Sequence, residues 1–294
     1  MAYIGPPITV ADVVVRPSRS IIKQSYDARE RRNDSSLPFH LGYGNLNGDG
    51  FGIGWFPPDS ACATADHTPC VFTSITPAWN NDNLNRLATK LESGVIFAHV
   101  RAAYPGMPVS EANCHPFQWG RYIFMHNGVV AGFMQIRRRL LAELGDAVYN
   151  AVQSFHSDSA VRLGDAGGHR SGIKSRGTAP HSPSLALSPP LRPACSIQAE
   201  AGMAPSDVSL LNFVVSDGRS LIATRYVSSA DEAPASLYYA EGSAYEREQL
   251  SGEEGDYHLL YSDKGSRVCL VASEPVTSAA HDWCEVPANT ALVV

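Results

Sequence analysis

Two short clusters in the sequence combine apolar residues with groups that could bind a small molecule. Phe97–Arg101 is an apolar run that ends in an arginine, and Phe124–Gly128 is an apolar run that ends in an Asn-Gly pair. The guanidinium of Arg101 offers a planar pair of donors to a carboxylate. The Asn127 side-chain amide and the Gly128 backbone N–H are the two donors that an oxyanion needs. The runs therefore predict two buried strands that form one wall of a small-molecule site.

Each cluster has a simpler interpretation when taken alone. A single arginine is more often part of a structural ion pair, and an Asn-Gly pair is more often a tight turn. The neighbouring histidines His99, His115 and His126 could be core residues or metal ligands. We predict no metal site, because no carboxylate or cysteine stands at ligand spacing from them.

A glycine-rich stretch, Asn47–Gly54, precedes the first cluster. It lacks the Gly-Lys-Ser/Thr ending of a phosphate loop, and position twelve of a calcium loop would be Phe56 rather than Glu. Glycine at every second position leaves one face of a strand without side chains. The pattern therefore predicts a strand whose backbone is approached closely by another part of the chain.

The remaining periodicity predicts a mixed α and β protein. Apolar spacing is helical over 9–15, 81–93 and 131–144, whereas 19–44 is polar and irregular. Within Asn47–Trp55 a turn is expected to lead into a strand, and further strands are expected over 94–100, 121–126, 210–216, 221–226, 236–240, 258–261, 267–272 and 290–294. Asp217-Gly218 is a hairpin-type turn. Hairpins without repeated β-α-β units favour stacked antiparallel sheets with helices outside, an α+β fold.

One segment does not fit this pattern. Residues 156–206 contain no Phe, Tyr or Trp, but six Pro, six Gly and nine Ser. Such a composition buries too little apolar surface to offset chain entropy, so we expect a disordered insert there. We accordingly expect a single domain over 1–294, interrupted at about 156–206.

Composition narrows the class of protein. The chain has 294 residues, 44% hydrophobic and 18% charged, with a formal net charge of -6. These values indicate a folded protein and argue against a nucleic-acid or anionic-membrane binder. The six cysteines form no C-x-x-C pair, and the N-terminus has no signal-peptide pattern, so a cytoplasmic location is the expectation.

Taken together, the motifs resemble the class II glutamine amidotransferases. The resemblance is to the stand-alone branch that includes the amidotransferase-like subunit of the fungal glutathione-degrading complex. It covers 1–150 and 207–294. The motifs that carry it, besides the two clusters, are Asn47–Gly54, Ile75–Asn80, Asn113–Phe117, Leu211–Phe213, Asp217-Gly218, Thr224–Tyr226 and Ala272–Pro275.

The resemblance implies a fold and a chemistry. The fold would be the four-layer α/β/β/α sandwich of N-terminal-nucleophile (Ntn) hydrolases, and the reaction hydrolysis of a γ-glutamyl amide such as glutamine or glutathione. Arg101 would bind the substrate α-carboxylate, and Asn127 and Gly128 would form the oxyanion hole. Asp158 would hold the substrate α-amino group. The nucleophile would be an N-terminal Cys with its own amine as base. No cofactor is implied, and a metallopeptidase-like protein is the implied partner.

The sequence departs from the family at three places. It begins Met1-Ala2-Tyr3, where the family has Met-Cys-Arg and an aromatic residue, so the nucleophile is missing. Asp158-Ser159 is a displaced remnant of a Thr-Asp-Ser-Glu motif, and Tyr104 replaces a small hydroxyl residue. Two explanations remain open: a gene-model error that also supplies 156–206 as translated intron, or a catalytically dead paralogue. The chain is thus either an impaired hydrolase or a non-catalytic γ-glutamyl-binding or regulatory subunit.

Overall fold

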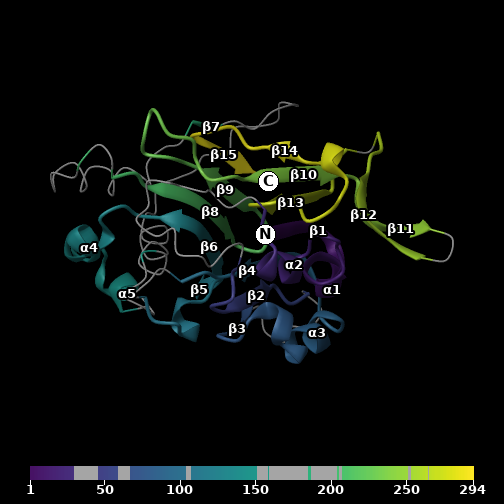
Figure 1. Ribbon diagram of the computed structural model, residues 1–294, viewed down its shortest axis with the longest axis horizontal. Helices are drawn as coiled ribbons and strands as arrows, with labels where there is room; N and C mark the ends of the chain where they lie inside the picture. The colour runs from purple at the N-terminus through teal and green to yellow at the C-terminus, as the bar shows by residue number, and fades with distance from the viewer. Residues whose placement is uncertain are drawn as a thin grey trace.

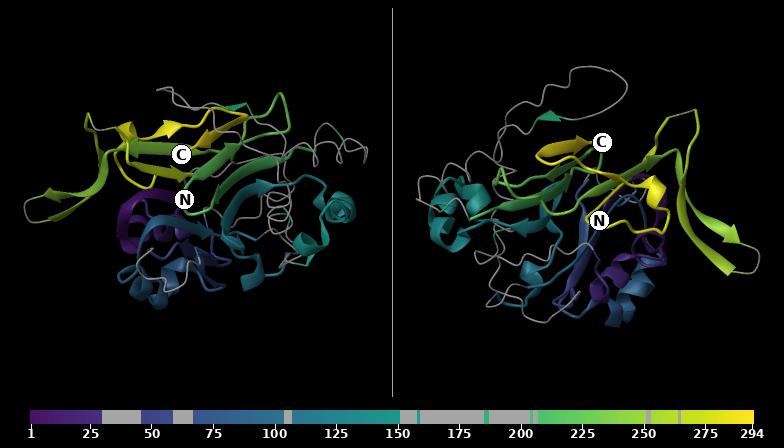
Figure 2. Two further views of the ribbon diagram at one scale, coloured as in Figure 1. Left: turned by 180° about the vertical axis from the view of Figure 1, so that it is seen from behind. Right: turned by 45° about the horizontal axis from the view of Figure 1, so that its top comes forward.

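The computed structural model shows two stacked antiparallel sheets with helices on the outside (Figure 1). It describes residues 1–29, 46–58, 67–103, 107–150, 158, 185–186, 204, 207–250, 253–263 and 265–294. Figure 2 shows the same layers from behind and from above.

The larger sheet has seven strands in the order β14-β10-β13-β1-β4-β2-β3. Their bounds are β1 Ala2–Thr9, β2 Phe51–Trp55, β3 Cys70–Ser74, β4 Glu92–Val100, β10 Tyr238–Gly242, β13 Val268–Ala272 and β14 Cys284–Glu285. Its central strands are buried on both faces. In β4, for example, Ile96 and Ala98 join the core under the helices, whereas Val95 and Phe97 join the core between the sheets.

The second sheet has six strands in the order β5-β6-β8-β9-β15-β7. Their bounds are β5 Phe117–Trp119, β6 Tyr122–Val129, β7 Leu185–Ala186, β8 Leu210–Ser216, β9 Leu221–Arg225 and β15 Thr290–Val293. The expected hairpin turn joins β8 to β9: the Asp217 carboxylate accepts the backbone N–H groups of Arg219 and Ser220. Gly218 there has a φ of 87°.

Helices cover the outer face of each sheet. The helices are α1 Val10–Val14, α2 Ile21–Tyr26, α3 Asp82–Ala88, α4 Phe133–Ala142 and α5 Asp146–Tyr149. Residues of α1, α2 and α3 pack in one core with the seven-stranded sheet, and Phe133, Ile136 and Leu140 of α4 pack with Leu211 of the six-stranded sheet. The predicted four-layer sandwich is confirmed.

Several elements differ from the sequence expectation. Strand β1 lies at the centre of its sheet, although Pro6 and Pro7 argue against a central strand. Its pairing with β4 shifts register between Ile4 and Ile8, so the two prolines fall in an irregular stretch. Helix α2 forms inside the expected irregular region because the Ser20 side chain caps it and Ile21 is buried. Helix α3 is shorter than expected, since the chain turns into β4 at Glu92.

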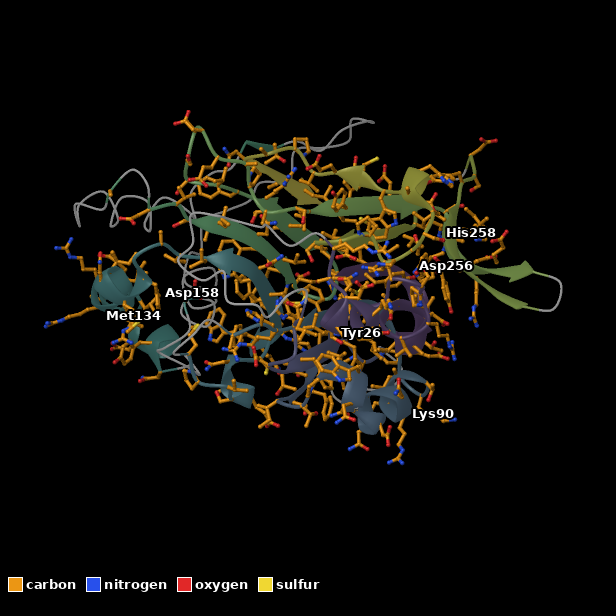
Figure 3. All side chains as sticks on the ribbon, viewed as in Figure 1. Tyr26, Lys90, Met134, Asp158, Asp256 and His258 are labelled. Atoms are coloured by element: carbon orange, nitrogen blue, oxygen red, sulfur yellow. The ribbon has the colours of Figure 1, made fainter. Side chains whose placement is uncertain are left out.

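Strands β11 (Ala244–Leu250) and β12 (Glu253–Leu260) form a separate hairpin that projects from the body (Figure 1). Its base is anchored: the Asp256 carboxylate accepts the Ser18 hydroxyl and the backbone N–H groups of Ser18 and Ser278. Figure 3 shows Asp256 and His258 at this base.

The expected disordered insert lies mostly outside the described residues. Within it, Leu185–Ala186 pair with β15, and Asp158 and Ala204 are placed. No helix in the described part of the chain is long and apolar enough to cross a membrane.

Candidate active site

The carboxyl ends of β4 and β6 bring the two predicted clusters together between the sheets. Side chains alternate along a strand, so residues that share parity with buried interior positions face the same way. Val95 and Phe97 of β4 and Ile123 and Met125 of β6 all belong to the core between the sheets. By the same alternation, Arg101 and Asn127 face this interior from opposite sheets.

Arg101 is held by its backbone and buried. Its N–H donates to Gly50 O and its carbonyl accepts from Asp49 N–H, both at 2.9 Å. Its side chain is only 7% exposed, and Nη2 lies 3.5 Å from the Pro108 carbonyl. Among the described residues, Nη1 has no hydrogen-bond partner. A buried guanidinium with a donor to spare is suited to a carboxylate ligand.

Gly50, just before β2, and Gly52 and Gly54 within it explain how this wall is packed. A Cβ at Gly52 would lie 2.2 Å from the His115 carbonyl oxygen, and one at Gly50 would lie 2.6 Å from Cys114 Sγ. One at Gly54 would lie 2.3 Å from Ile123 Cδ1. The predicted close approach is therefore confirmed, and the approaching partners are the 113–116 segment and the other sheet.

Asn127 and Gly128 are exposed at the end of β6, where β8 pairs with them. Gly128 has a φ of 148°, and a Cβ there would lie 1.9 Å from the Leu210 carbonyl oxygen. Only glycine fits this backbone. The Asn-Gly pair is thus not a tight turn but the continuation of a paired strand, with its polar groups reachable from solvent.

Asp158 lies next to this strand end. Its carboxylate accepts the Val130 N–H at 2.8 Å, two residues after Gly128. Figure 3 labels Asp158 in this region, near β6 and α4. The structure therefore places Asp158 beside the end of β6 that carries Asn127 and Gly128, and Tyr104 lies outside the described residues.

Three histidines lie beside these groups. The His99 and His115 ring centroids are 4.3 Å apart, and His126 Nε2 lies 3.2 Å from the Leu210 carbonyl oxygen. Burial lowers the pKa of His99 to about 3 and that of His115 well below its usual value. Both rings are therefore neutral at pH 7. No group of three His, Cys, Asp or Glu side chains in the described ranges has the arrangement to hold a metal ion.

The N-terminal residue sits between β4 and β13, short of Arg101. Ala2 pairs with Phe97, and the Met1 amine donates to the Ala98 carbonyl at 2.7 Å. Burial lowers the pKa of this amine from 8.0 to about 5. Strand β4 continues past Met1, so in the same register a residue three positions before Met1 would stand opposite Arg101.

None of the four described cysteines supplies an activated thiol to this site. Cys114 is the described cysteine nearest to Arg101 in the sequence, and its Sγ contacts the Ser74 and Ser110 carbonyls. Burial raises the pKa of its thiol, although the charge of Arg101 opposes that shift. Cys269 is also buried with a raised pKa of about 12, and Cys70 and Cys284 are exposed on outer strands.

Asp49 is a residue of the candidate site that the sequence reasoning missed. Its carboxylate accepts the Ala103 N–H at 2.8 Å, and its own N–H bonds the Arg101 carbonyl. It thus clasps the backbone on both sides of the arginine. The sequence Asn47-Gly48-Asp49-Gly50 resembles half of a calcium loop, and that pattern predicts a different role for this carboxylate.

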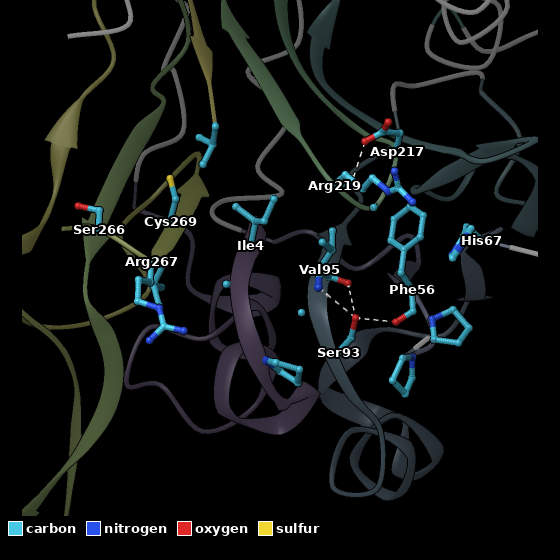
Figure 4. A pocket seen from close by; sticks show the side chains of 18 of the residues that line it. Ile4, Phe56, His67, Ser93, Val95, Asp217, Arg219, Ser266, Arg267 and Cys269 are labelled. Atoms are coloured by element: carbon cyan, nitrogen blue, oxygen red, sulfur yellow. Dashed lines mark hydrogen bonds between the residues drawn. The ribbon is translucent and has the colours of Figure 1, made fainter. Parts of the chain in front are cut away.

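A separate cavity of about 500 Å³ opens at the other end of β4. Figure 4 shows Ile4 and Val95 on its floor, with Arg219 and Arg267 on opposite sides. It lies at the Ser93 end of the strand and includes none of the predicted site residues.

Sequence comparison identifies the class of protein. The family model for class II glutamine amidotransferases matches residues 37–150. A probable glutamine amidotransferase of Saccharomyces cerevisiae, DUG3, is 36% identical over 295 residues, 98% of this chain and 78% of the relative. The chain therefore belongs to the class II glutamine amidotransferases.

Two further similarities concern part of the sequence and the fold. A γ-glutamyl-hercynylcysteine sulfoxide hydrolase of Mycolicibacterium smegmatis is 29% identical over 130 residues, 44% of this chain and 50% of the relative. A glutamine amidotransferase class II domain protein of Silicibacter pomeroyi has a similar fold, with a TM-score of 0.53 and 22% identity, covering 99% of this chain and 92% of that one.

Proposed function

We propose that this site binds a γ-glutamyl amide, either glutamine or a glutathione-type γ-glutamyl bond. Arg101 binds the α-carboxylate, Asp158 the α-amino group, and Asn127 and Gly128 the γ-carbonyl oxygen. The observation that carries the proposal is the buried Arg101, whose Nη1 has no partner among the described residues, facing the oxyanion strand from the opposite sheet. One γ-glutamyl molecule carries a carboxylate and an amide carbonyl at its two ends.

Hydrolysis at this site needs a thiol at the start of β1. The Cys thiol loses its proton to its own α-amine, and the sulfur attacks the γ-carbonyl. The amide C–N bond breaks as the amine returns the proton to the leaving nitrogen. Water then cleaves the γ-glutamyl thioester to release glutamate and restore the thiol. The Met1 amine of the present chain stands three residues short of Arg101 along β4 and carries no thiol.

Restoring the thiol in register tests the proposal. The variant replaces Met1 with Met-Cys-Arg-aromatic and one further residue before Ala2, so that, after removal of the initiator Met, Cys stands opposite Arg101. We expect glutamate release from glutamine or glutathione only with this extension. The matched control carries Ser in place of Cys. Glutamate release by the unextended chain would refute the need for the thiol. If the extended chain folds but releases no glutamate, the defect would lie in 156–206.

A second candidate function follows because none of the four described cysteines offers an activated thiol to the site. In this case the protein is a non-catalytic γ-glutamyl-binding or regulatory subunit, and a partner protein recognises its binding site. Calorimetry with glutamine on the unextended chain distinguishes the two: binding without release supports the subunit. Absence of glutamine binding by the folded chain would refute both candidates.

The remaining expectations are proposals about context. We place the protein in the cytoplasm as a single domain over 1–294, with a metallopeptidase-like protein as partner. The composition of 156–206 favours translated intron sequence over a real insert. Transcripts that run through this stretch in frame would refute that explanation and leave the inactive paralogue.

A further inference from the structure

Asn113 is a buried asparagine that lies beside Arg101. It ends the short turn η3 (Glu111–Asn113) and is only 2% exposed. Its Nδ2 donates to the Pro108 carbonyl oxygen at 2.9 Å, and Nη2 of Arg101 approaches the same oxygen at 3.5 Å. The amide and the guanidinium are therefore neighbours that meet at one backbone oxygen atom.

Each of these two groups keeps one buried polar atom without a partner in the described part of the chain: Nη1 of Arg101 and Oδ1 of Asn113. The guanidinium nitrogen can only donate, and the amide oxygen can only accept. The orientation of the amide follows from its contact, because the opposite orientation would bring two oxygen atoms together at Pro108. An unpaired buried donor and an unpaired buried acceptor each cost free energy, so the pair is complementary to a ligand that supplies both partners.

The backbone that carries Asn113 is fixed relative to the arginine. The Asn113 N–H donates to the Ser110 carbonyl at 3.0 Å. Cys114, the next residue, lies directly against Gly50, whose carbonyl accepts the Arg101 N–H. The amide oxygen is therefore held at a set position beside the guanidinium, as a recognition group must be.

An α-amino acid presents the two missing partners together. Its α-carbon carries a carboxylate, which accepts hydrogen bonds, and an ammonium group, which donates them. A plain carboxylic acid would satisfy Arg101 but leave Oδ1 of Asn113 unpaired. The rings of His99 and His115 also have unpaired buried nitrogens among the described residues, but a neutral imidazole offers a donor and an acceptor alike and so favours neither ligand.

We propose that Asn113 is a specificity-determining residue whose Oδ1 accepts a hydrogen bond from the α-ammonium group of the ligand, while Arg101 binds the α-carboxylate. An ammonium group has three N–H bonds, so this contact adds to the one proposed for Asp158. The inference rests on the proposed function, since it concerns how the same site distinguishes an α-amino acid from a plain acid.

The test uses the unextended chain and two ligands that differ at one group. Glutamine carries the α-ammonium group, whereas glutaric acid monoamide has the same carboxylate and the same terminal amide with a hydrogen atom in its place. Hydrogen bonds to charged groups are among the stronger ones in proteins. We expect calorimetry to show that the parent chain binds glutamine at least about thirtyfold more tightly than the monoamide.

Two substitutions separate the acceptor from the contact with Pro108. Asn113→Leu and Asn113→Asp both lose the Nδ2 donor, but only Asn113→Asp keeps an oxygen that accepts. We expect Asn113→Leu to reduce the preference for glutamine about tenfold and Asn113→Asp to retain it. Asn85→Leu, at an exposed asparagine of α3, is the matched control with the parent preference.

The outcomes separate the two levels of the proposal. If neither ligand binds the folded parent chain, the proposed function fails and the inference with it. If glutamine binds but Asn113→Leu keeps the full preference, or the parent has none, the inference is refuted while binding of the α-carboxylate stands. If Asn113→Leu and Asn113→Asp lose the preference alike, Asn113 acts through the Pro108 carbonyl, which also refutes the inference. If Asn113→Leu does not fold, Asn113→Ala removes the same acceptor and decides by the same ratio.

Discussion

The two halves of the site are built differently. The clamp side, formed by Arg101 on β4 with β2 and the 113–116 segment, is buried and held by backbone contacts at van der Waals limits. The side proposed to hold the oxyanion, formed by Asn127 and Gly128 on β6, is exposed and fixed by strand pairing and the Asp158 carboxylate. The difference teaches that changes in the packed backbone of the clamp side act through folding, whereas changes to the polar side chains proposed to meet the ligand, on either side, act on ligand contacts.

The largest expected effect is a loss of unfolding free energy as the pH falls, which tests whether the groups beside the clamp side are buried. The Met1 amine has a pKa of about 5 in the folded chain and 8.0 ordinarily, so the unfolded chain takes up its proton first as the pH falls. The buried neutral amine contributes fully to the unfolding free energy above pH 8, and this contribution is lost as the pH falls to 5. The expected decrease in unfolding free energy is about 4 kcal/mol. His99, with a pKa lowered from 6.5 to about 3, extends the loss below pH 6.5.

Urea unfolding between pH 8.5 and pH 5, on protein shown by mass spectrometry to retain Met1, measures this dependence. A flat stability between pH 8 and pH 6.5 would show that the amine is solvated and that the clamp side is more open than described.

The next effect concerns the backbone contact under the clamp. Gly52→Ala places a methyl against the His115 carbonyl, with an expected loss of about 3 kcal/mol in unfolding free energy. Gly145→Ala is the matched control, because no atom lies within 4 Å of its added Cβ. Equal urea midpoints for the two variants would contradict the tight packing.

Arg101→Lys tests the proposed contact between the clamp side and the α-carboxylate of the ligand. It replaces the two-pronged donor by a point charge, and we expect glutamine binding to weaken about thirtyfold, or about 2 kcal/mol. Calorimetry measures the affinity, and thermal unfolding within about 2 °C of the parent separates a lost contact from a lost fold. Unchanged affinity would remove Arg101 from the site.

The smallest effect belongs to the exposed side. Asp158→Asn removes the charge at the Val130 N–H, and we expect about fivefold weaker glutamine binding, about 1 kcal/mol, with little change in stability. Asp146→Asn, an exposed carboxylate at the start of α5, is the control and should bind like the parent. A large loss of stability in Asp158→Asn, but not in the control, would show that Asp158 acts through folding rather than through ligand contacts.

Much of the fold could be predicted from local pattern, and the failures have physical causes. The hairpin at Asp217-Gly218 and the strand of alternating glycines carry their geometry in the residue types themselves. Strand β1 could not be predicted, because its prolines exclude a regular strand and the compensating register shift depends on β4. Helix α2 depends on Ile21 meeting the core, which polar composition conceals.

The site was predictable in its parts but not in its assembly. Arg101, Asn127 and Gly128 carry recognisable chemistry, but the sequence does not say that they stand on different sheets. Asp49 contacts the backbone of Ala103, which is remote in sequence, and no local motif records that relation. Only the resemblance predicts a role for Asp158, and no sequence pattern predicts its contact with Val130, which lies 28 residues before it.

The glycines in and just before β2 also limit which side chains this part of the chain can carry. Gly50, Gly52 and Gly54 each face atoms that leave no room for a methyl group, so a random substitution at any of the three would damage the sandwich. On the β2 side, the space between β2 and the 113–116 segment is therefore filled by backbone alone, and the chain has no room there for any side chain larger than a hydrogen atom.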